Sequence, residues 1–118
     1  MIVRRIVPDL YGDDPAGSRA FYENVIGLEV AMDLGWIVTY ASPSNETAQL
    51  SVLSSDATAA VIPHVSVQVD DVDAVYEKAV QHGYEIVHPL SDEPWGVRRF
   101  FVRDPNGSVI NVMRHTAS

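Results

Sequence analysis

The sequence predicts an α+β fold made of two βαβββ modules. Two helical runs each follow a strand-like run, and each ends at a glycine, Gly27 or Gly83, before a short strand. A further pair of strand-like runs comes after each short strand. The repeat of about 55 to 60 residues is longer than solenoid repeats, and two copies are too few for an array. We therefore expect one pseudo-symmetric domain over residues 1–118, with module one at 1–57 and module two at 58–118.

In module one, an apolar run predicts the first strand, and acidic residues able to cap a helix follow it. The helical run around Phe21 and Tyr22 has core spacing, so we expect both rings in the core. The predicted strands are 3–7, 28–30, 36–40 and 49–53.

In module two, Asp70 and Asp71 come before the helical run and are its expected caps. The predicted strands are 65–69, 84–86, 98–103 and 108–113. The small and polar stretch 54–60 is typical of a linker between the modules.

The last two strands form a predicted hairpin. Asp104-Pro105-Asn106-Gly107 separates them, and Asn-Gly favours a type I′ turn, in which both central residues have positive φ. A Pro-Trp-Gly step leads into this unit and places Trp95 at its mouth. Asn111 stands among apolar neighbours in the last strand, which predicts a polar amide in the core or in a pocket.

Composition excludes several classes of protein. With 47% hydrophobic residues the chain can bury a core, and it has no apolar run of membrane-spanning length. The first residues lack the pattern of a secretory signal, so we expect a cytoplasmic protein. A net charge of −8 opposes nucleic-acid binding, and it either attracts cationic small molecules or only keeps the protein soluble. The absence of cysteine excludes disulfides, thiolate zinc sites and cysteine nucleophiles.

Most catalytic motifs are also missing from the sequence. There is no glycine-rich phosphate loop, no Gly-x-Ser-x-Gly elbow and no closely spaced His-Glu metal motif. The acidic run at 70–73 is similar to a calcium loop but lacks the rest of that loop, and helix capping explains it.

Four ordered motifs nevertheless resemble the glyoxalase/bleomycin-resistance/extradiol-dioxygenase superfamily across almost the whole chain. They are Asp14-x-x-x-Ser18-x-x-Phe21-Tyr22 with Ile26-Gly27-Leu28-Glu29, His64 with the strand after it, Pro94-Trp95-Gly96-x-Arg98, and Asp104-Pro105-Asn106-Gly107. The resemblance implies a cup-shaped mixed sheet around a ligand cavity, often in a homodimer. This superfamily hosts isomerases, dioxygenases, thiol transferases and metal-free drug binders, so the fold alone does not give the function.

The resemblance also implies four positions for metal ligands. His64 matches one of them, whereas the other three fall on Val7, Ser51 and Asn111. Iron, manganese or zinc would need imidazole and carboxylate ligands there. Asp9 and Gln49 are oxygen donors that could substitute, but we expect no metal and no cofactor. His64 is then either hydrogen-bonded across the sheet or a ligand contact.

A group of aromatic residues either holds a flat ligand or fills the core between sheet and helix. Trp36 and Tyr40 share one face of their predicted strand, Trp95 stands at the hairpin mouth, and either Phe100 or Phe101 faces the cup. Either Arg98 or its neighbour Arg99 also faces inward or lies at the rim, where it pairs with a carboxylate of the protein or the ligand; a surface salt bridge is the alternative. The expected ligand contacts are Trp36, Tyr40, Ser51, His64, Trp95, Arg98, Phe101 and Asn111.

Two hypotheses follow from the sequence. The Pro-Trp-Gly-x-Arg step resembles the antibiotic-resistance branch, which implies a metal-independent protein that sequesters an aromatic or cationic small molecule. The alternative is an enzyme on the same fold: a lyase or isomerase with His64 as general acid/base, or a metalloenzyme with substituted ligands. We expect a small-molecule ligand and a second copy of the chain as partners, and neither nucleic acid nor membrane.

Overall fold

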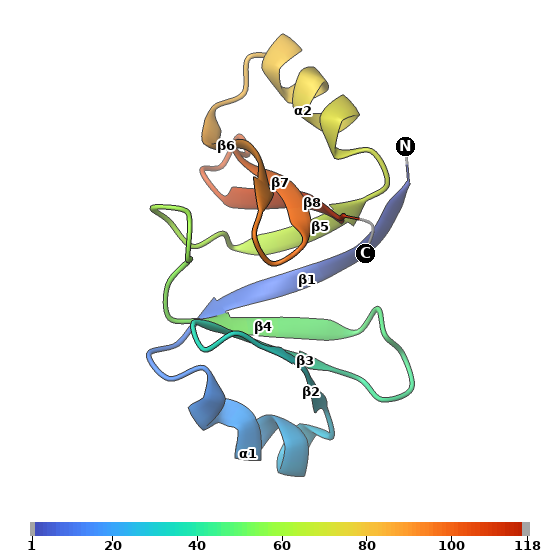
Figure 1. Ribbon diagram of the computed structural model, residues 1–118, viewed down its shortest axis with the longest axis vertical. Coiled ribbons are helices and arrows are strands. Elements are labelled where there is room, and N and C mark those ends of the chain that lie inside the picture. Colours follow the sequence, from blue (N-terminus) through green and yellow to red (C-terminus); the bar gives the residue numbers. More distant parts are fainter. Residues whose placement is uncertain (1, 117–118) are drawn as a thin grey trace. The chain divides into compact units, whose positions relative to one another are not determined.

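The computed structural model describes residues 2–116 and contains two βαβββ modules (Figure 1). The predicted α+β class is confirmed. The first module consists of β1 (Val3–Tyr11), η1 (Ala16–Ser18), α1 (Arg19–Phe21), η2 (Tyr22–Ile26), β2 (Glu29–Asp33), β3 (Ile37–Ala41) and β4 (Gln49–Leu53). The second consists of β5 (Val65–Val69), α2 (Val72–Gln81), β6 (Ile86–Glu93), β7 (Val97–Arg103) and β8 (Val109–His115). No helix within residues 2–116 is long and apolar enough to cross a membrane.

The eight strands pair in the order β2-β3-β4-β1-β5-β8-β7-β6. Within each module the first strand runs parallel to the last, and the remaining pairs are antiparallel. The chain divides into two compact units. One unit contains residues 7–62, and the other combines the residues before Val7 with those from Pro63 onward. The first part of β1 therefore belongs to the same unit as module two, although it precedes module one in the sequence.

The helical segment of module one is irregular. The backbone N–H of Gly17 donates to the carboxylate of Asp14 at 3.1 Å, and the segment ends at Gly27, whose φ is 91°. Tyr22 packs against the core residues Val38, Tyr40 and Val52. Phe21 is 53% exposed, so its predicted place in the core is wrong.

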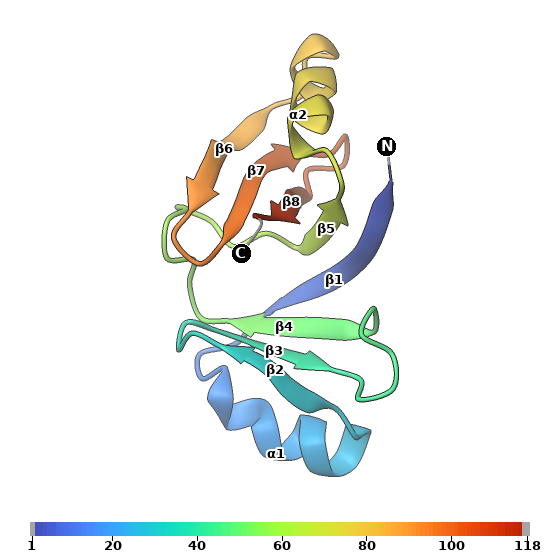
Figure 2. The same cartoon turned by 45° about the vertical axis from the view of Figure 1, so that its right-hand side comes forward.

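The helix of module two is capped as predicted. The side chain of Asp71 accepts a hydrogen bond from the backbone N–H of Ala74 at 3.1 Å, which is worth about 1 kcal/mol. Figure 2 shows α2 beside the strands of its own unit, and it packs on β6, β7 and β8. Its Tyr76 meets Phe100 edge-on at a ring separation of 5.2 Å, in a core that includes Val69 and Val112. Phe100 is thus the phenylalanine that faces the helix.

The predicted hairpin between β7 and β8 is present, but its turn is not type I′. Gly107 N–H donates to the carbonyl of Asp104 at 3.0 Å, which makes Pro105 and Asn106 the central residues. Only glycines have positive φ within residues 2–116, and Gly107 has a φ of 90°. This is the pattern of a type I turn followed by a left-handed glycine. Pro105 fixes a negative φ at the first central position, which excludes a primed turn there.

The hairpin between β6 and β7 uses the same turn. Gly96 N–H donates to the carbonyl of Glu93 at 3.1 Å, and Gly96 has a φ of 90°. Pro94 and Trp95 occupy the two central positions. Both turns therefore have the pattern acidic residue, proline, variable residue, glycine.

Candidate small-molecule site

One row of side chains crosses module two on the face opposite α2. Asn111 of β8 is the cross-strand partner of Ser66 on β5 and of Phe101 on β7, and Phe101 is the partner of His88 on β6. Val112 and Phe100, the next residues along these strands, point to the helix-covered core. We name Ser66, Asn111, Phe101 and His88 the module-two row.

Asn111 is the least satisfied member of this row. Its amide nitrogen donates to the hydroxyl of Ser66 at 2.9 Å, and the residue is 7% exposed. Its side-chain oxygen is buried and has no hydrogen-bond partner within the part of the chain that the structure describes. A buried acceptor without a donor costs about 1 to 3 kcal/mol. Such atoms are rare in folded proteins, and each needs a reason.

Phe101 and His88 form the other end of the row. The Phe101 side chain is fully buried, and its ring centre lies 5.0 Å from that of His88. His88 Nε2 contacts the carboxylate of Glu93 at 3.1 Å, and the two side chains are only 11% and 5% exposed. Because a carboxylate accepts hydrogen bonds, it holds the proton of a neutral imidazole on Nε2.

Arg99 completes this face of β7. Its Nε donates to the same Glu93 oxygen at 2.6 Å, and its side chain is 4% exposed. The guanidinium carbon lies 4.9 Å from the centre of the Trp95 ring and 4.7 Å from that of Phe101. Both rings thus already contact a cation that belongs to the protein. Of the two adjacent arginines, Arg99 is the one on the face of the row.

His64 is hydrogen-bonded across the sheet, as one of the two sequence interpretations proposed. Its Nδ1 accepts a hydrogen bond from the backbone N–H of Val109 at 3.0 Å. The backbone N–H of His64 donates to the Val109 carbonyl at 2.9 Å. An imidazole that accepts at Nδ1 carries its proton on Nε2, so neither nitrogen is ready to bind a metal. A metal-bound histidine instead donates from its second nitrogen.

The side chains at the four expected ligand positions do not fit a divalent metal. Asn111 and Ser51 supply no negative charge, Val7 supplies no donor atom, and His64 uses Nδ1 for a backbone contact. Residues 2–116 contain no group of three or more His, Asp or Glu side chains that could hold a metal ion.

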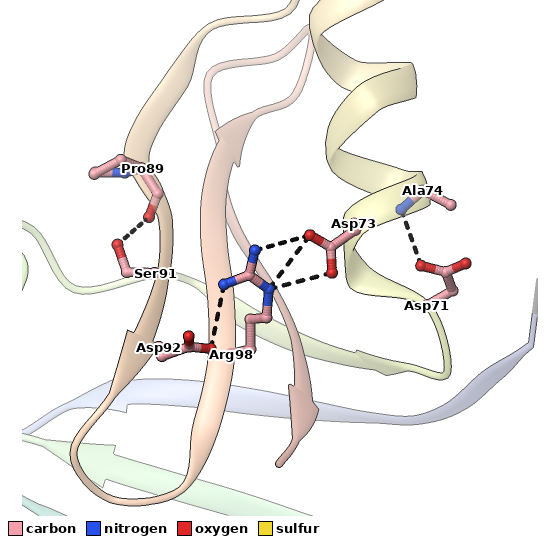
Figure 3. A network of polar contacts seen from close by, with 7 residues as sticks. All are labelled: Asp71, Asp73, Ala74, Pro89, Ser91, Asp92 and Arg98. Atoms are coloured by element: carbon pink, nitrogen blue, oxygen red, sulfur yellow. Dashed lines mark hydrogen bonds and ion pairs between the residues drawn. The ribbon is translucent and has the colours of Figure 1, made fainter.

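Arg98 lies on the helix side of β7. It makes two hydrogen bonds to Asp73 of α2 from Nε and one of 2.8 Å from a terminal nitrogen, and it also pairs with Asp92 (Figure 3). Asp73 raises the pKa of Arg98, and Arg98 in turn lowers the pKa of Asp73. The alternation of β7 separates Arg98 from Phe101, so the structure does not bring these two expected ligand contacts together.

Three other expected contacts lie in module one. Tyr40 has no exposed surface, packs on Tyr22 and donates its hydroxyl to the Pro15 carbonyl at 2.7 Å, and burial raises its pKa. Tyr40 is therefore a core residue in this structure. The hydroxyl of Ser51 is 2.7 Å from that of Thr39. Trp36 precedes β3, so strand alternation does not place it on the same face as Tyr40.

Sequence reasoning missed His88, Glu93 and Arg99 as a group. The strand pattern does indicate that one arginine of the 98–99 pair faces each side, but not which one. Nothing in the sequence marks His88, because β6 is irregular where it pairs with β7 and no simple alternation extends to this residue. The proline-glycine turn that carries Glu93 and Trp95 was the available signal.

Comparison with known proteins gives one family and several relatives. Residues 3–112 match the model of the Glyoxalase/Bleomycin resistance protein/Dioxygenase superfamily. CFP32 of Mycobacterium bovis is 25% identical over 88% of this chain, and CFP32 of Mycobacterium tuberculosis matches equally well. The chain spans 42% of the length of these curated relatives.

Solved structures share the fold at low identity. A superfamily member from Vibrio splendidus has a TM-score of 0.69 at 20% identity, covering 96% of this chain and 99% of its own. The methylmalonyl-CoA epimerase of Streptomyces coelicolor has 0.73 at 16% identity, covering 98% and 100%. An extradiol ring-cleaving dioxygenase from B. fuscum has 0.70 at 21% identity, covering 98% of this chain and 33% of its own. These likenesses concern the fold, because enzymes of different chemistry share it.

Proposed function

The chain belongs to the Glyoxalase/Bleomycin resistance protein/Dioxygenase superfamily, and we propose that it binds a small organic molecule without a metal ion. The ligand lies on the module-two row. The observation that carries this proposal is the buried side-chain oxygen of Asn111, which has no hydrogen-bond partner. A ligand that presents an N–H or O–H group would satisfy this oxygen and recover its desolvation cost.

The surroundings of Asn111 favour a flat and uncharged ligand. Phe101 lies next to it on the row, and Arg99 covers its apolar ring in the free protein, so a ligand must displace Arg99 to contact it. Arg99 already lies over Phe101 and Trp95, so a cationic ligand would have to replace a cation of the protein at these rings. The structure therefore supports the aromatic ligand expected from the sequence better than the cationic one.

The first test measures the free protein. In a Ser66→Ala background, which already lacks the hydrogen bond from Asn111, replacing Asn111 with leucine removes only the unsatisfied oxygen from the polar contacts, so we expect Asn111→Leu to raise the free energy of unfolding by about 1 kcal/mol. Chemical denaturation of both proteins measures this change. The same substitution at the exposed turn residue, Asn106→Leu, is the control and should leave stability nearly unchanged. A destabilised Asn111→Leu protein would mean that the oxygen is satisfied, and the proposal would lose its support.

The second test measures binding. In a Trp36→Phe background, Trp95 is the remaining tryptophan, and its emission reports on the face of the row. We expect a heteroaromatic compound from a panel that includes bleomycin and mitomycin to shift this emission, and Asn111→Leu to abolish the shift. If no compound changes the emission, sequestration of an aromatic guest loses its main support.

An enzyme on the same face is the second candidate, because His88 and Glu93 form a histidine–carboxylate pair beside the row. In that case His88 rather than His64 is the better candidate for the acid/base, since His64 uses Nδ1 for a backbone contact. Turnover of a bound compound that is lost in His88→Gln while binding persists would favour this candidate.

Drug sequestration, a homodimer and a cytoplasmic location remain predictions. We propose the homodimer because Ile2, just before β1, and Ile6 of β1 are each 56% exposed, and a second copy would cover these apolar side chains. Light scattering at micromolar concentration should give twice the 13.0 kDa chain mass. A monomer would contradict this assembly without affecting the row.

A further inference from the structure

The turn between β7 and β8 contains a pair of residues that the proposed function does not use. Asn106 is followed by Gly107, and both residues are exposed. Within residues 2–116 the backbone N–H of Asn106 donates to Asp104, whereas its side-chain amide forms no hydrogen bond. A Cβ atom at Gly107 would meet no atom of another described segment within 4 Å. The side-chain carbonyl carbon of Asn106 is therefore open to attack by a nucleophile.

The backbone nitrogen of the next residue is such a nucleophile. The nitrogen of Gly107 attacks the side-chain carbonyl carbon of Asn106, and the new C–N bond closes a succinimide ring. The bond from this carbon to the side-chain nitrogen breaks, and ammonia leaves with the proton of the Gly107 N–H. Water then opens the ring at one of its two carbonyls, which gives aspartate or isoaspartate without oxidation or reduction. Glycine favours the attack because it has no side chain to hinder it.

The folded turn keeps this nitrogen in another contact. The Gly107 N–H donates to the Asp104 carbonyl at 3.0 Å. The Asp104 carboxylate also accepts hydrogen bonds from the backbone N–H groups of Asn106 and Ser108, both at 2.9 Å. At the second central residue of a type I turn ψ is about 0°, which turns the Gly107 nitrogen away from the Asn106 side chain. The attack therefore requires the turn to open.

We propose that Asn106 is a site of spontaneous deamidation and that Asp104 controls its rate by keeping the turn closed. The turn is exposed and depends on a few hydrogen bonds, so it opens locally more often than the buried strands beside it. An aspartate product keeps the turn, because it adopts the same negative φ. An isoaspartate product adds a carbon to the backbone and moves the Gly107 N–H away from Asp104. This inference does not depend on the proposed function.

Variants of Asp104 test its control of the rate in the folded chain. Asp104→Ala removes the carboxylate that holds the N–H groups of Asn106 and Ser108, so deamidation at residue 106 should be about fivefold faster. Asp104→Asn keeps a side-chain oxygen as acceptor and should retain nearly the wild-type rate. The introduced asparagine does not cyclise, because Pro105 has no N–H. Thermal melts establish that each variant is folded before its rate is compared.

Incubation at mildly alkaline pH, followed by mass spectrometry of the peptides, measures the conversion of each asparagine. We expect isoaspartate and aspartate to form at residue 106 of the folded chain. In guanidinium chloride the three hydrogen bonds to Asp104 are lost, so conversion there should be more than about tenfold faster. Asn45, which is exposed but precedes a glutamate, is the internal control and should convert more slowly than Asn106 in the denaturant.

The denaturant also separates the effect of the turn from that of the local chemistry. Wild type, Asp104→Ala and Asp104→Asn should convert at nearly the same rate once they are unfolded, because only the folded turn distinguishes them. Equal rates at residue 106 in the folded and unfolded wild type would overturn the inference, as would no conversion there in either state. A folded Asp104→Ala chain that deamidates at the wild-type rate would also overturn it.

Discussion

The two modules contain equivalent polar positions and use them differently. In module one, Ser51 of β4 pairs in register with Asp9 of β1 and with Thr39 of β3, and the two hydroxyls of Ser51 and Thr39 are 2.7 Å apart. In module two, Asn111 of β8 holds the corresponding place between the parallel first strand and β7. Ser66 satisfies its nitrogen, and nothing in the described chain satisfies its oxygen.

The two modules differ in whether the polar atoms at this fold position are satisfied, and the binding that we propose would use the unsatisfied one. A pair of hydroxyls can satisfy each other because each is both donor and acceptor. A side-chain amide has both an N–H₂ donor and an oxygen acceptor, and a single neighbouring hydroxyl bonds only one of them here. Module one has therefore a closed polar pair, whereas module two keeps an acceptor available at a cost in stability, as functional sites often do.

The largest expected effect distinguishes the two arginines of β7. Arg99→Ala leaves Glu93 buried without this partner, so we expect a loss of about 3 to 5 kcal/mol of unfolding free energy. Arg98→Ala, its neighbour, removes a partly exposed pair with Asp73 and should cost less than about 1 kcal/mol. Urea denaturation of both variants measures the contrast. Similar losses of unfolding free energy in the two variants would mean that the buried pair Arg99–Glu93 stabilises the protein no more than the partly exposed pair Arg98–Asp73.

A smaller effect tests the closed pair in module one. Ser51→Ala leaves the buried Thr39 hydroxyl without this partner and should cost about 1 to 3 kcal/mol. The double variant Ser51→Ala with Thr39→Val replaces both hydroxyls and should recover part of that loss. The same denaturation experiment compares the two. If the double variant loses as much as the sum of its single variants, the hydroxyls do not act as a pair.

The smallest effect concerns the helix side of β7 and depends on pH. Arg98 lowers the pKa of Asp73 below its ordinary value of 3.8. The pair therefore stabilises the folded protein at pH values above the pKa that Asp73 has in the unfolded chain. This stabilisation is lost as the pH falls through the lower pKa that Asp73 has in the folded protein. The Asp73 side chain is 47% exposed, so solvent weakens the pair. We therefore expect Asp73→Asn to reduce the acid-induced fall in melting temperature only slightly. Scanning calorimetry between neutral pH and acid measures it, and an increased fall would contradict the sign.

Sequence alone predicted the fold because its signals are local. The Asp71 cap and the two glycine-ended helices need only neighbouring residues, and these predictions are confirmed. Strand alternation predicted that Phe100 and Phe101 face opposite sides, yet only the packing of Tyr76 on Phe100 shows which one faces the helix.

The candidate site was less predictable because it depends on contacts between strands. Glu93, His88 and Arg99 meet through the pairing of β6 with β7, and that pairing is irregular. Tyr40 was expected beside Trp36, but the strand begins after Trp36, and Tyr40 packs under the helical segment. Similarly, Asn106-Gly107 favoured a type I′ turn, but Pro105 is the first central residue and its ring requires a negative φ there.

The turn geometry that the two hairpins share does not require a tryptophan at position 95. In both turns the glycine has the positive φ, and the residue before it has an ordinary negative φ that most side chains adopt. One turn carries Trp95 at this position, and the other carries Asn106. The backbone therefore places little constraint on the residue at position 95. If Trp95 contacts a ligand, as we propose, a single substitution there would change the ligand preference while the hairpin kept its geometry.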